Sequence, residues 1–281
     1  MDIELVKPFI DNALKEDVGD GDHTSLATIP PDTTGKAKLL VKDQGIIAGV
    51  ELAEYIFHRV DKNLKLNIFI KDGTEVKPGD IVLEVEGNVI SILTAERLVL
   101  NCMQRMSGIA TNTDHIVDLL KGTNTQVLDT RKTTPGMRYL EKWAVRIGGG
   151  VNHRFGLYDM ILIKDNHVDY SGGIARAIEN AQQYIEKTGK KLAIEIEVRN
   201  QEELDEVLRT GGVDRILLDN FSFPDLKQAV NIIEGRYITE ASGGITVDNV
   251  RDYANCGVDY VSIGALTHSV KCLDLSLKAV K

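Results

Sequence analysis

The second half of this 281-residue chain constrains its fold most strongly, because short apolar segments alternate there with amphipathic ones. Six segments have the apolar pattern of strands, at residues 126–129, 160–163, 192–198, 215–218, 237–239 and 260–263. Four segments between them have helical periodicity, at residues 174–187, 201–209, 224–233 and 247–254. Apolar strands that alternate with helices predict a parallel sheet covered on its faces. The number of strands, without a polar edge strand, favours an α/β barrel over an open sheet.

Residues 1 to about 110 mix the two patterns without a regular order. Helical periodicity occurs at residues 6–17 and 51–60. The alternation typical of half-exposed strands occurs at residues 35–41, 64–70 and 81–86. These segments predict a small open sheet with helices on one face. A long helix is predicted from Thr94 to Met106, and Gly108 is expected to break it before residues 111–121 continue as helix.

The composition excludes several classes of protein. The chain carries 33 Lys and Arg against 42 Asp and Glu, a formal net charge of −9, which argues against a general affinity for nucleic acid or anionic membranes. No apolar run approaches the roughly 18 residues that cross a bilayer, and the acidic start lacks the plan of a signal peptide, so we expect a cytoplasmic protein. The three cysteines lie far apart, which predicts neither a disulfide framework nor a structural zinc site.

A basic segment stands out against this acidic background. Residues 131–164 contain seven Lys and Arg side chains and two acidic ones. Such clustering costs self-repulsion, which is easiest to explain if a polyanionic ligand supplies the missing negative charge. Lys142 and Arg146 are four residues apart in an expected helix and are assigned to its solvated surface. The remaining candidates for binding this ligand are Arg131, Lys132, Arg154 and Lys164.

Polar side chains also stand at the ends of the predicted strands. In an α/β barrel the carboxyl ends of the strands face one common mouth, so residues there can meet. Glu197 and Asp219 end neighbouring strands without an obvious cation nearby in the sequence. Carboxylates at such a place can bind sugar hydroxyls, hold a divalent metal ion or transfer protons; a salt bridge between strands is the simpler alternative. Glu195 points to the same face as Glu197, so spacing does not choose between them.

Two glycine-containing loops follow late strands. The first, at residues 242–244, stands between a strand and a helix, where free backbone N–H groups and the helix dipole favour a phosphate. The second, at residues 264–265, follows the next strand and would complete such a site. The glycines at 148–150 could instead form only a helix cap and a turn. The residues alone therefore predict an α/β barrel with an anionic, phosphorylated and sugar-containing substrate.

Five longer motifs carry a resemblance. They are Thr130-Arg-Lys-Thr-Thr-Pro-Gly136, Gly148-Gly-Gly-Val-Asn-His-Arg154, Leu162-Ile-Lys-Asp-Asn-His167, Leu217-Leu-Asp-Asn220 and Ser242-Gly-Gly244. Together they resemble the quinolinate phosphoribosyltransferase family, also called nicotinate-nucleotide pyrophosphorylases (carboxylating), and the likeness runs from Glu16 to the last residues. It implies a type II phosphoribosyltransferase fold, with an N-terminal α/β sandwich and a C-terminal incomplete, seven-stranded α/β barrel. We predict the sandwich at residues 1–110, joined by the tail 268–281, and the barrel at residues 111–267.

The resemblance also implies a reaction, a cofactor and an assembly. Quinolinate and phosphoribosyl pyrophosphate would give nicotinate mononucleotide, pyrophosphate and carbon dioxide, with magnesium (Mg²⁺), in de novo NAD synthesis. A homodimer is implied, sometimes assembled further, in which each active site borrows residues from the neighbouring subunit. Beyond these small-molecule substrates and the second subunit, we expect no nucleic-acid or membrane partner.

The resemblance further implies roles for individual residues. Those expected to bind quinolinate are the partner subunit's Arg97, together with Thr130, Arg131, His153, Arg154 and Lys164. Those expected to bind phosphoribosyl pyrophosphate are Lys132, Glu197, Asp219, Ser242, Gly243, Gly244, Ile263, Gly264 and Ala265. The catalytic residues would be Lys132, Lys164, Glu197 and Asp219, and the two carboxylates among them would also hold magnesium through the substrate.

Three other interpretations stay open. A paralogous group encoded with molybdate transporters is similar over the same length, although the intact Thr130-Arg-Lys and Asn152-His-Arg favour the quinolinate enzyme. A Schiff-base lyase could place its nucleophilic amine at Lys164, at the end of a barrel strand. Residues 73–86 resemble half of a biotinyl or lipoyl carrier hairpin. They lack an exposed lysine at the hairpin tip and are interpreted as a structural hairpin.

Overall fold

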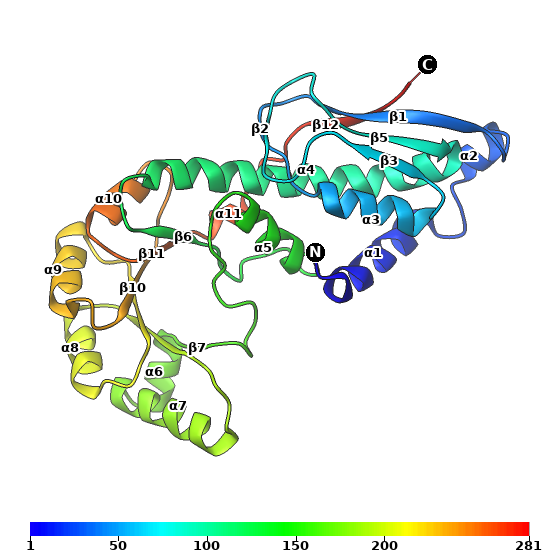
Figure 1. The fold of residues 1–281 in the computed structure, drawn as a ribbon. Coiled ribbons are helices and arrows are strands. Elements are labelled where there is room, and N and C mark those ends of the chain that lie inside the picture. The colour runs from blue at the N-terminus through cyan, green and yellow to red at the C-terminus, as the bar shows by residue number, and fades with distance from the viewer. Residues whose placement is uncertain (281) are drawn as a thin grey trace. The chain divides into compact units, whose positions relative to one another are not determined.

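The computed structural model describes residues 1–280, and the chain divides into two compact units. The first contains Met1–Asp114, Thr133–Gly149 and Leu266–Lys281. The second contains His115–Lys132 and Gly150–Ala265. Figure 1 labels the helices and strands of both units.

The first unit contains an antiparallel sheet whose four strands have the order β12-β1-β5-β3. These strands are β1 (Thr34–Val41), β3 (Lys65–Ile68), β5 (Ile81–Asn88) and β12 (Leu275–Ala279). Two short strands, which pair with each other, are β2 (Gly45–Ile46) and β4 (Glu75–Val76). The helices that lie wholly or mostly in this unit are α1 (Ile3–Val18), α2 (His23–Thr28), α3 (Val50–Val60), α4 (Val89–Leu120), α5 (Arg138–Ile147) and α11 (Ala265–His268).

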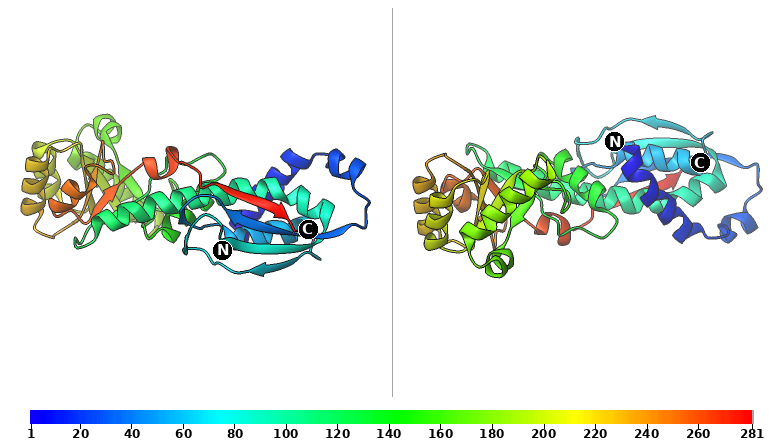
Figure 2. Two further views of the ribbon diagram at one scale, coloured as in Figure 1. Left: turned by 90° about the horizontal axis from the view of Figure 1, so that it is seen from above. Right: turned by 90° about the horizontal axis from the view of Figure 1, so that it is seen from below.

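The periodicity of the sequence explains how this sheet and its helices pack. In β1, Ala37, Leu39 and Val41 are buried and alternate with more exposed residues. In α3, Leu52 and Ile56 are completely buried. Figures 1 and 2 show α3 and the N-terminal part of α4 on one face of the sheet. The predicted small sheet with helices on one face is therefore confirmed.

Helix α4 continues through Gly108, so the predicted break there is wrong. Glycine inside a helix costs only about 1 kcal/mol relative to alanine, which packing can outweigh. A Cβ atom at Gly108 would collide with the backbone of Lys271 and Cys272, so this glycine allows the C-terminal segment to approach the helix closely. None of the helices within residues 1–280 combines the length and the apolar character needed to cross a membrane.

The second unit contains a parallel sheet with the strand order β6-β11-β10-β9-β8-β7. Its strands are β6 (Gln126–Leu128), β7 (Ile161–Ile163), β8 (Ile194–Val198), β9 (Arg215–Asp219), β10 (Ile238–Ser242) and β11 (Tyr260–Ser262). Its helices are α6 (Asp165–Ser171), α7 (Ile174–Thr188), α8 (Gln201–Thr210), α9 (Phe223–Ile233) and α10 (Val250–Asn255). Figure 1 shows α8, α9 and α10 on the outer side of the strands. Each of the six predicted strands is present.

The predicted sandwich and incomplete barrel are confirmed, although the parallel sheet has six strands where the resemblance implies seven. Val151 occupies the position beyond β6, where it forms a single parallel bridge with Leu128. This bridge does not extend into a strand within the described residues. In the loop after Val151, the Asn152 side chain and the His153 backbone N–H donate hydrogen bonds to the Asp129 carboxylate.

The predicted domain boundaries at residues 110 and 267 stay a prediction. The compact units differ from them at Thr133–Gly149, which contains α5 and packs with the first unit. Lys142 in this helix is 2% exposed, so its assignment to a solvated surface is wrong. Arg146 is exposed, as that assignment expects.

Candidate active site

A pocket of ≈ 300 Å³ lies at the carboxyl ends of the parallel strands, within the second unit. The residues that line it are Thr130, Arg131, Lys132, His153, Arg154, Leu162, Lys164, Leu217, Glu240, Ser242 and Ser262. These residues come from segments far apart in the sequence, which the strand ends of a barrel bring together. Most of them are positions at which the sequence predicts a substrate contact.

Lys164 and Glu197 form an ion pair at this pocket. Lys164 follows the last residue of β7, and its Nζ lies 2.8 Å from Oε2 of Glu197. The Glu197 side chain is 8% exposed, whereas that of Lys164 is 47% exposed and lines the pocket. The sequence offers no cation near Glu197, but strand β7 pairs with β8 and brings Lys164 beside it.

Asp219 ends β9 next to Glu197 on β8. Burial raises the pKa of Asp219, and the negative charge of Glu197 raises it further. Asn220 Nδ2 donates a 2.6 Å hydrogen bond to Oδ2 of Asp219. Two carboxylates that repel each other are stabilised by a divalent cation, and oxygen atoms are the ligands that magnesium prefers. This donor set fits the predicted magnesium role, with the other ligands supplied by substrate oxygens.

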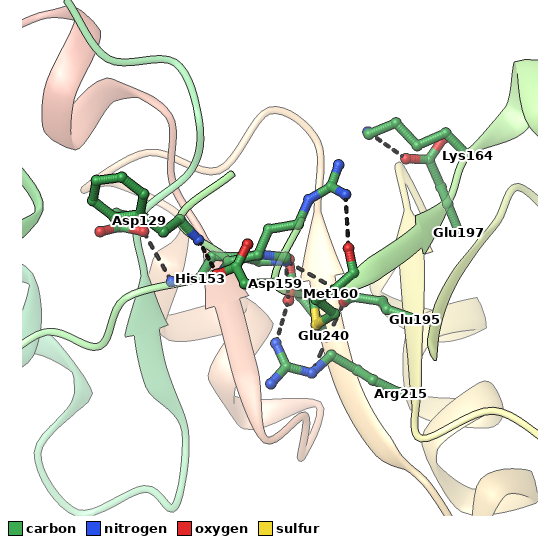
Figure 3. A network of polar contacts seen from close by, with 11 residues as sticks. Asp129, His153, Asp159, Met160, Lys164, Glu195, Glu197, Arg215 and Glu240 are labelled. Atoms are coloured by element: carbon green, nitrogen blue, oxygen red, sulfur yellow. Dashed lines mark hydrogen bonds and ion pairs between the residues drawn. The ribbon is translucent and has the colours of Figure 1, made fainter. Parts of the chain in front are cut away.

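A second cluster of charged side chains adjoins the pocket (Figure 3). Nε2 of His153 lies 3.0 Å from Oε2 of Glu195 and 3.5 Å from Oε2 of Glu240. Arg215 places Nη1 3.1 Å from the same Glu240 oxygen, and both glutamates are buried. Among residues 1–280, His153, Glu195 and Glu240 form the group whose ligand-type atoms all lie within 4.8 Å of one another. Arg215 already supplies a positive charge here, so the cluster does not require a metal ion.

The contacts at the two ring nitrogens of His153 have opposite effects on its protonation. Burial alone would lower the pKa of His153, but the contacts with Glu195 and Glu240 outweigh it and raise the pKa to about 9. The backbone N–H of Arg154 donates a 2.7 Å hydrogen bond to Nδ1, which favours a ring with its single proton on Nε2. Protonation of Nδ1 would break this hydrogen bond, so the charge of His153 and the backbone of Arg154 are linked.

The raised pKa predicts that the contribution of His153 to stability depends on pH. Below the ordinary value of 6.5 this contribution is complete, and it is lost as the pH rises through about 9. We expect the free energy of unfolding of the wild type, relative to His153→Gln, to fall by up to about 3 kcal/mol between about pH 6 and about pH 10. Urea unfolding of both proteins measures this difference. A difference independent of pH would mean that the Arg154 N–H keeps the ring neutral.

The loop that carries His153 and Arg154 is anchored by a buried carboxylate. Asp129 is fully buried after β6, and its Oδ1 accepts a 2.9 Å hydrogen bond from the backbone N–H of His153. Its Oδ2 accepts a 2.5 Å hydrogen bond from Nδ2 of Asn152. Arg154 Nη1 donates a 3.1 Å hydrogen bond to the carbonyl oxygen of Met160. These contacts hold Arg154 at the pocket wall.

The cations of the pocket repel one another. Burial lowers the pKa of Arg154, and the positive charge of Arg131 lowers it further. A bound anion would relieve this repulsion, because it would offer each guanidinium a charge-assisted hydrogen bond. The structure places Arg131, Arg154 and Lys164 around one pocket.

The predicted phosphate loops lie at the ends of β10 and β11. Ser242 lines the pocket, and Gly243 has φ = 98°. A Cβ atom at Gly243 would collide with the side chain of Asn220, so glycine is required by both conformation and space. The carbonyl oxygen of Gly244 accepts a 3.0 Å hydrogen bond from Asn249 Nδ2. Gly148 caps α5, in agreement with the simpler interpretation of its glycine run.

Several predicted residues do not line the pocket. Arg97 is an exposed residue of α4 in the first unit. The residues of the β11 loop, Ile263, Gly264 and Ala265, are also outside the set of lining residues, as are Glu197, Asp219, Gly243 and Gly244. Ile263 is buried, and its backbone N–H donates to Leu128 O at 3.0 Å. Their predicted contacts with substrate stay predictions.

Glu240 and Arg215 are parts of the site that were not predicted from the sequence. Arg215 begins β9, whose next three residues are apolar, and Glu240 is buried in the middle of β10. A charged residue inside a buried strand needs a partner, because burying an unpaired charge is costly. That rule would have identified both positions, although it would not have named their partners.

Comparisons with known proteins agree along the whole chain. A family model described as quinolinate phosphoribosyl transferase, N-terminal domain, matches residues 22–107, and the corresponding C-terminal domain model matches residues 109–278. Quinolinate phosphoribosyltransferase (decarboxylating) 2, mitochondrial, from Nicotiana glauca is 46% identical over 97% of this chain and 82% of its own length. A probable nicotinate-nucleotide pyrophosphorylase (carboxylating) from Bacillus subtilis is 41% identical over 97% of this chain and 92% of its own length.

A solved structure supports the same conclusion. The crystal structure of NadC from Streptococcus pyogenes matches with a TM-score of 0.93 and 38% identity, and the match covers 100% of this chain and 99% of that one. The two family models together span most of the chain, and the two relatives are more than 40% identical to it over nearly its whole length. These matches all indicate the same family. The chain belongs to the quinolinate phosphoribosyltransferase family.

Proposed function

We propose that this protein transfers the phosphoribosyl group of phosphoribosyl pyrophosphate to quinolinate, with loss of carbon dioxide, in NAD biosynthesis. The products are nicotinate mononucleotide and pyrophosphate. The observation that carries this proposal is the convergence of Arg131, Arg154 and Lys164 on one pocket of a chain with a net charge of −9. Membership of the family supports the identity of both substrates.

Quinolinate is a planar dianion, and the pocket offers it complementary charge. Arg131, Arg154 and Lys164 would each donate charge-assisted hydrogen bonds to its two carboxylates. Thr130 and His153 line the same pocket and would contact the acid beside these cations. The pocket is large enough for a pyridine ring, at ≈ 300 Å³.

The sugar transfer needs negative charge near the anomeric carbon. Displacement there passes through an oxocarbenium-like state, which nearby carboxylates stabilise. Glu197 and Asp219 supply these carboxylates next to Lys164. Lys132 lines the pocket and would neutralise charge on the departing pyrophosphate. Magnesium, when bound, would neutralise the pyrophosphate further.

The phosphate of the ribose would lie at the loops after β10 and β11. Ser242 lines the pocket, and the glycines that follow it allow backbone N–H groups to approach a ligand. The contacts proposed for this phosphate are from Ser242, Gly243, Gly244, Ile263, Gly264 and Ala265.

Decarboxylation would follow the sugar transfer. Alkylation of the ring nitrogen makes the pyridine ring a cation, which stabilises the carbanion left at the adjacent carbon when carbon dioxide departs. This carbon then takes up a proton from water. No protein base is needed for this step. Release of labelled carbon dioxide from quinolinate should therefore require phosphoribosyl pyrophosphate. Release from quinolinate alone would show that the proposed order is wrong.

The structure disfavours the Schiff-base alternative. Lys164 Nζ donates a 2.8 Å hydrogen bond to Oε2 of Glu197, whereas a nucleophilic amine needs a free lone pair. The carrier-hairpin alternative is also disfavoured, because residues 73–86 contribute β4 and β5 to the sheets of the first unit. Activity with quinolinate would separate this protein from the molybdate-linked paralogues.

A homodimer with shared active sites is part of this proposal, as is its possible further assembly. Arg97 is exposed and is not among the residues that line the pocket of its own chain. It is therefore free to contact the substrate in the pocket of a neighbouring subunit. A cytoplasmic location stays a prediction, since the Nicotiana glauca relative is named mitochondrial.

Subunit sharing predicts that two inactive variants restore each other's activity. Arg97→Ala and Lys164→Ala homodimers should each be nearly inactive, because each lacks a cation at every site. Mixed in equal amounts under conditions that exchange subunits, they should recover up to about a quarter of the wild-type activity. About half of the dimers are then hybrids, and one of the two sites in each hybrid carries both residues. Subunit exchange is confirmed by a tag on one variant. Exchange without recovered activity would place Arg97 outside the shared site.

A further inference from the structure

Two buried carboxylates, Glu195 and Glu240, lie in the interior of the barrel. They come from strands β8 and β10, and Arg215 comes from the strand between these two, β9. Glu195, Arg215 and Glu240 belong to β8, β9 and β10, which are neighbours in the sheet, and Arg215 is paired with Glu195 in register. Glu195 is 0% exposed and Glu240 is 1% exposed. Within residues 1–280, Oε1 of Glu195 and Oε1 of Glu240 accept no hydrogen bond, and Oε2 of Glu195 faces Nε2 of His153 at 3.0 Å. Arg215 supplies the permanent positive charge beside both carboxylates.

We propose that Arg215 is a positioning residue for the dicarboxylate pocket, acting through Glu195 and Glu240 on His153 and through His153 on Arg154. This inference rests on the proposed function, because it assigns Arg215 to the binding of quinolinate and not of phosphoribosyl pyrophosphate. Arg215 itself does not line the pocket, and its side chain is 18% exposed.

The contacts run without a gap from Arg215 to the pocket wall (Figure 3). Arg215 Nη1 is 3.1 Å from Oε2 of Glu240, and its Nε is 3.9 Å from Oε1 of Glu195. The same two carboxylates lie 3.5 Å and 3.0 Å from Nε2 of His153. On the opposite side of the ring, Nδ1 accepts the 2.7 Å hydrogen bond from the backbone N–H of Arg154. With its proton on Nε2, the ring of His153 faces the carboxylates through Nε2 and accepts from Arg154 at Nδ1, so the position of the ring determines that of the Arg154 backbone.

Arg215 is itself held in one place. Its guanidinium carbon lies 4.7 Å from the centre of the Tyr260 ring, in a cation–π contact. Without the guanidinium, the charges of Glu195 and Glu240 would repel each other and would act on His153 alone. Movement of the imidazole ring would then release the Arg154 N–H and misplace the guanidinium of Arg154. The side-chain partners described for Arg215 within residues 1–280 are Glu195, Glu240 and Tyr260, so the phosphoribosyl end of the pocket, around Ser242, would keep its geometry.

The test compares the affinities for the two substrates in the variant Arg215→Met. We expect the KM for quinolinate to rise at least about tenfold and the KM for phosphoribosyl pyrophosphate to stay within about twofold. The Kd for phthalate, a dicarboxylate of the same shape without the ring nitrogen, should rise by the same factor in calorimetry. Arg215→Lys, which keeps a positive charge, should recover part of this affinity.

Two further variants keep the test decisive. Arg251 is exposed and donates hydrogen bonds to backbone carbonyls of the same unit away from the pocket, so Arg251→Met controls for the general loss of an arginine and its hydrogen bonds. If Arg215→Met does not fold, Glu240→Gln removes one charge with little change in volume and should shift quinolinate and phthalate affinity in the same direction. Unchanged phthalate affinity, or equal loss of affinity for both substrates, would overturn the inference. A wild type that binds phthalate but does not turn over quinolinate would instead contradict the proposed function.

Discussion

Replacement of Lys164 by methionine is expected to lower kcat/KM for quinolinate by roughly 100-fold or more, while the protein remains folded. Lys164 lines the pocket and also pairs directly with a proposed catalytic carboxylate, Glu197. A charge pair at about 4 Å with an effective dielectric constant near 20 is worth about 4 kcal/mol before desolvation is subtracted. A net loss of about 3 kcal/mol corresponds to roughly 100-fold.

The variant should lose more than one contact. Without Lys164, Glu197 and Asp219 keep their mutual repulsion with no neighbouring ammonium group. We therefore expect both the KM for quinolinate to rise and kcat to fall. Lys191→Met, which changes an exposed lysine of the same unit, serves as the matched control and should behave as the wild type. Steady-state kinetics measure the effect, and a change of less than about threefold in kcat/KM would exclude Lys164 from the site.

Replacement of Arg105 by methionine is expected to lower the free energy of unfolding by about 3–5 kcal/mol. Glu141 is completely buried in α5, and Arg105 Nε of α4 donates a 2.7 Å hydrogen bond to its Oε1. Arg105 Nη2 also donates to Oγ1 of Thr134 at 2.9 Å and to the carbonyl oxygen of Thr267 at 3.0 Å. The substitution would leave a buried carboxylate without its counter-charge.

A double variant separates the cost of the orphaned charge from the loss of packing. Arg105→Met combined with Glu141→Gln should recover part of the stability, because no buried charge then remains. Lys7→Met removes the exposed ion pair with Asp11 and should leave the unfolding midpoint almost unchanged. Chemical denaturation measures all three variants. An Arg105→Met protein within about 1 kcal/mol of the wild type would show that Glu141 does not depend on this partner.

The order of strands and helices in the second unit could be predicted from the sequence alone. Strands of a parallel sheet are buried on both faces and tend to be apolar, as are the three central residues of β9. The predicted strand at 215–218 and the observed Arg215–Asp219 differ by one residue. By contrast, the break expected at Gly108 was wrong, because glycine there satisfies a packing requirement that is set by Lys271 and Cys272, more than 160 residues away.

The pocket could be predicted in its composition but not in its pairings. Position at the end of a strand indicated Arg131 and Lys164, and the basic segment 131–164 added Arg154 as a candidate for the same ligand. It could not show that Lys164 pairs with Glu197, because that contact depends on which strands are neighbours. Likewise, the position of Arg215 between Glu195 and Glu240 follows from the strand order β10-β9-β8 and from the register of each pair.

The formation of nicotinate mononucleotide tests the central claim most directly. The purified protein is incubated with quinolinate, phosphoribosyl pyrophosphate and magnesium, and the product is followed by chromatography, with each component omitted in turn. We predict that the product appears with all three components and is absent when any one is omitted, including magnesium removed by a chelator. Folded protein that forms no nicotinate mononucleotide from the complete mixture would contradict the assignment of quinolinate as the substrate of this pocket.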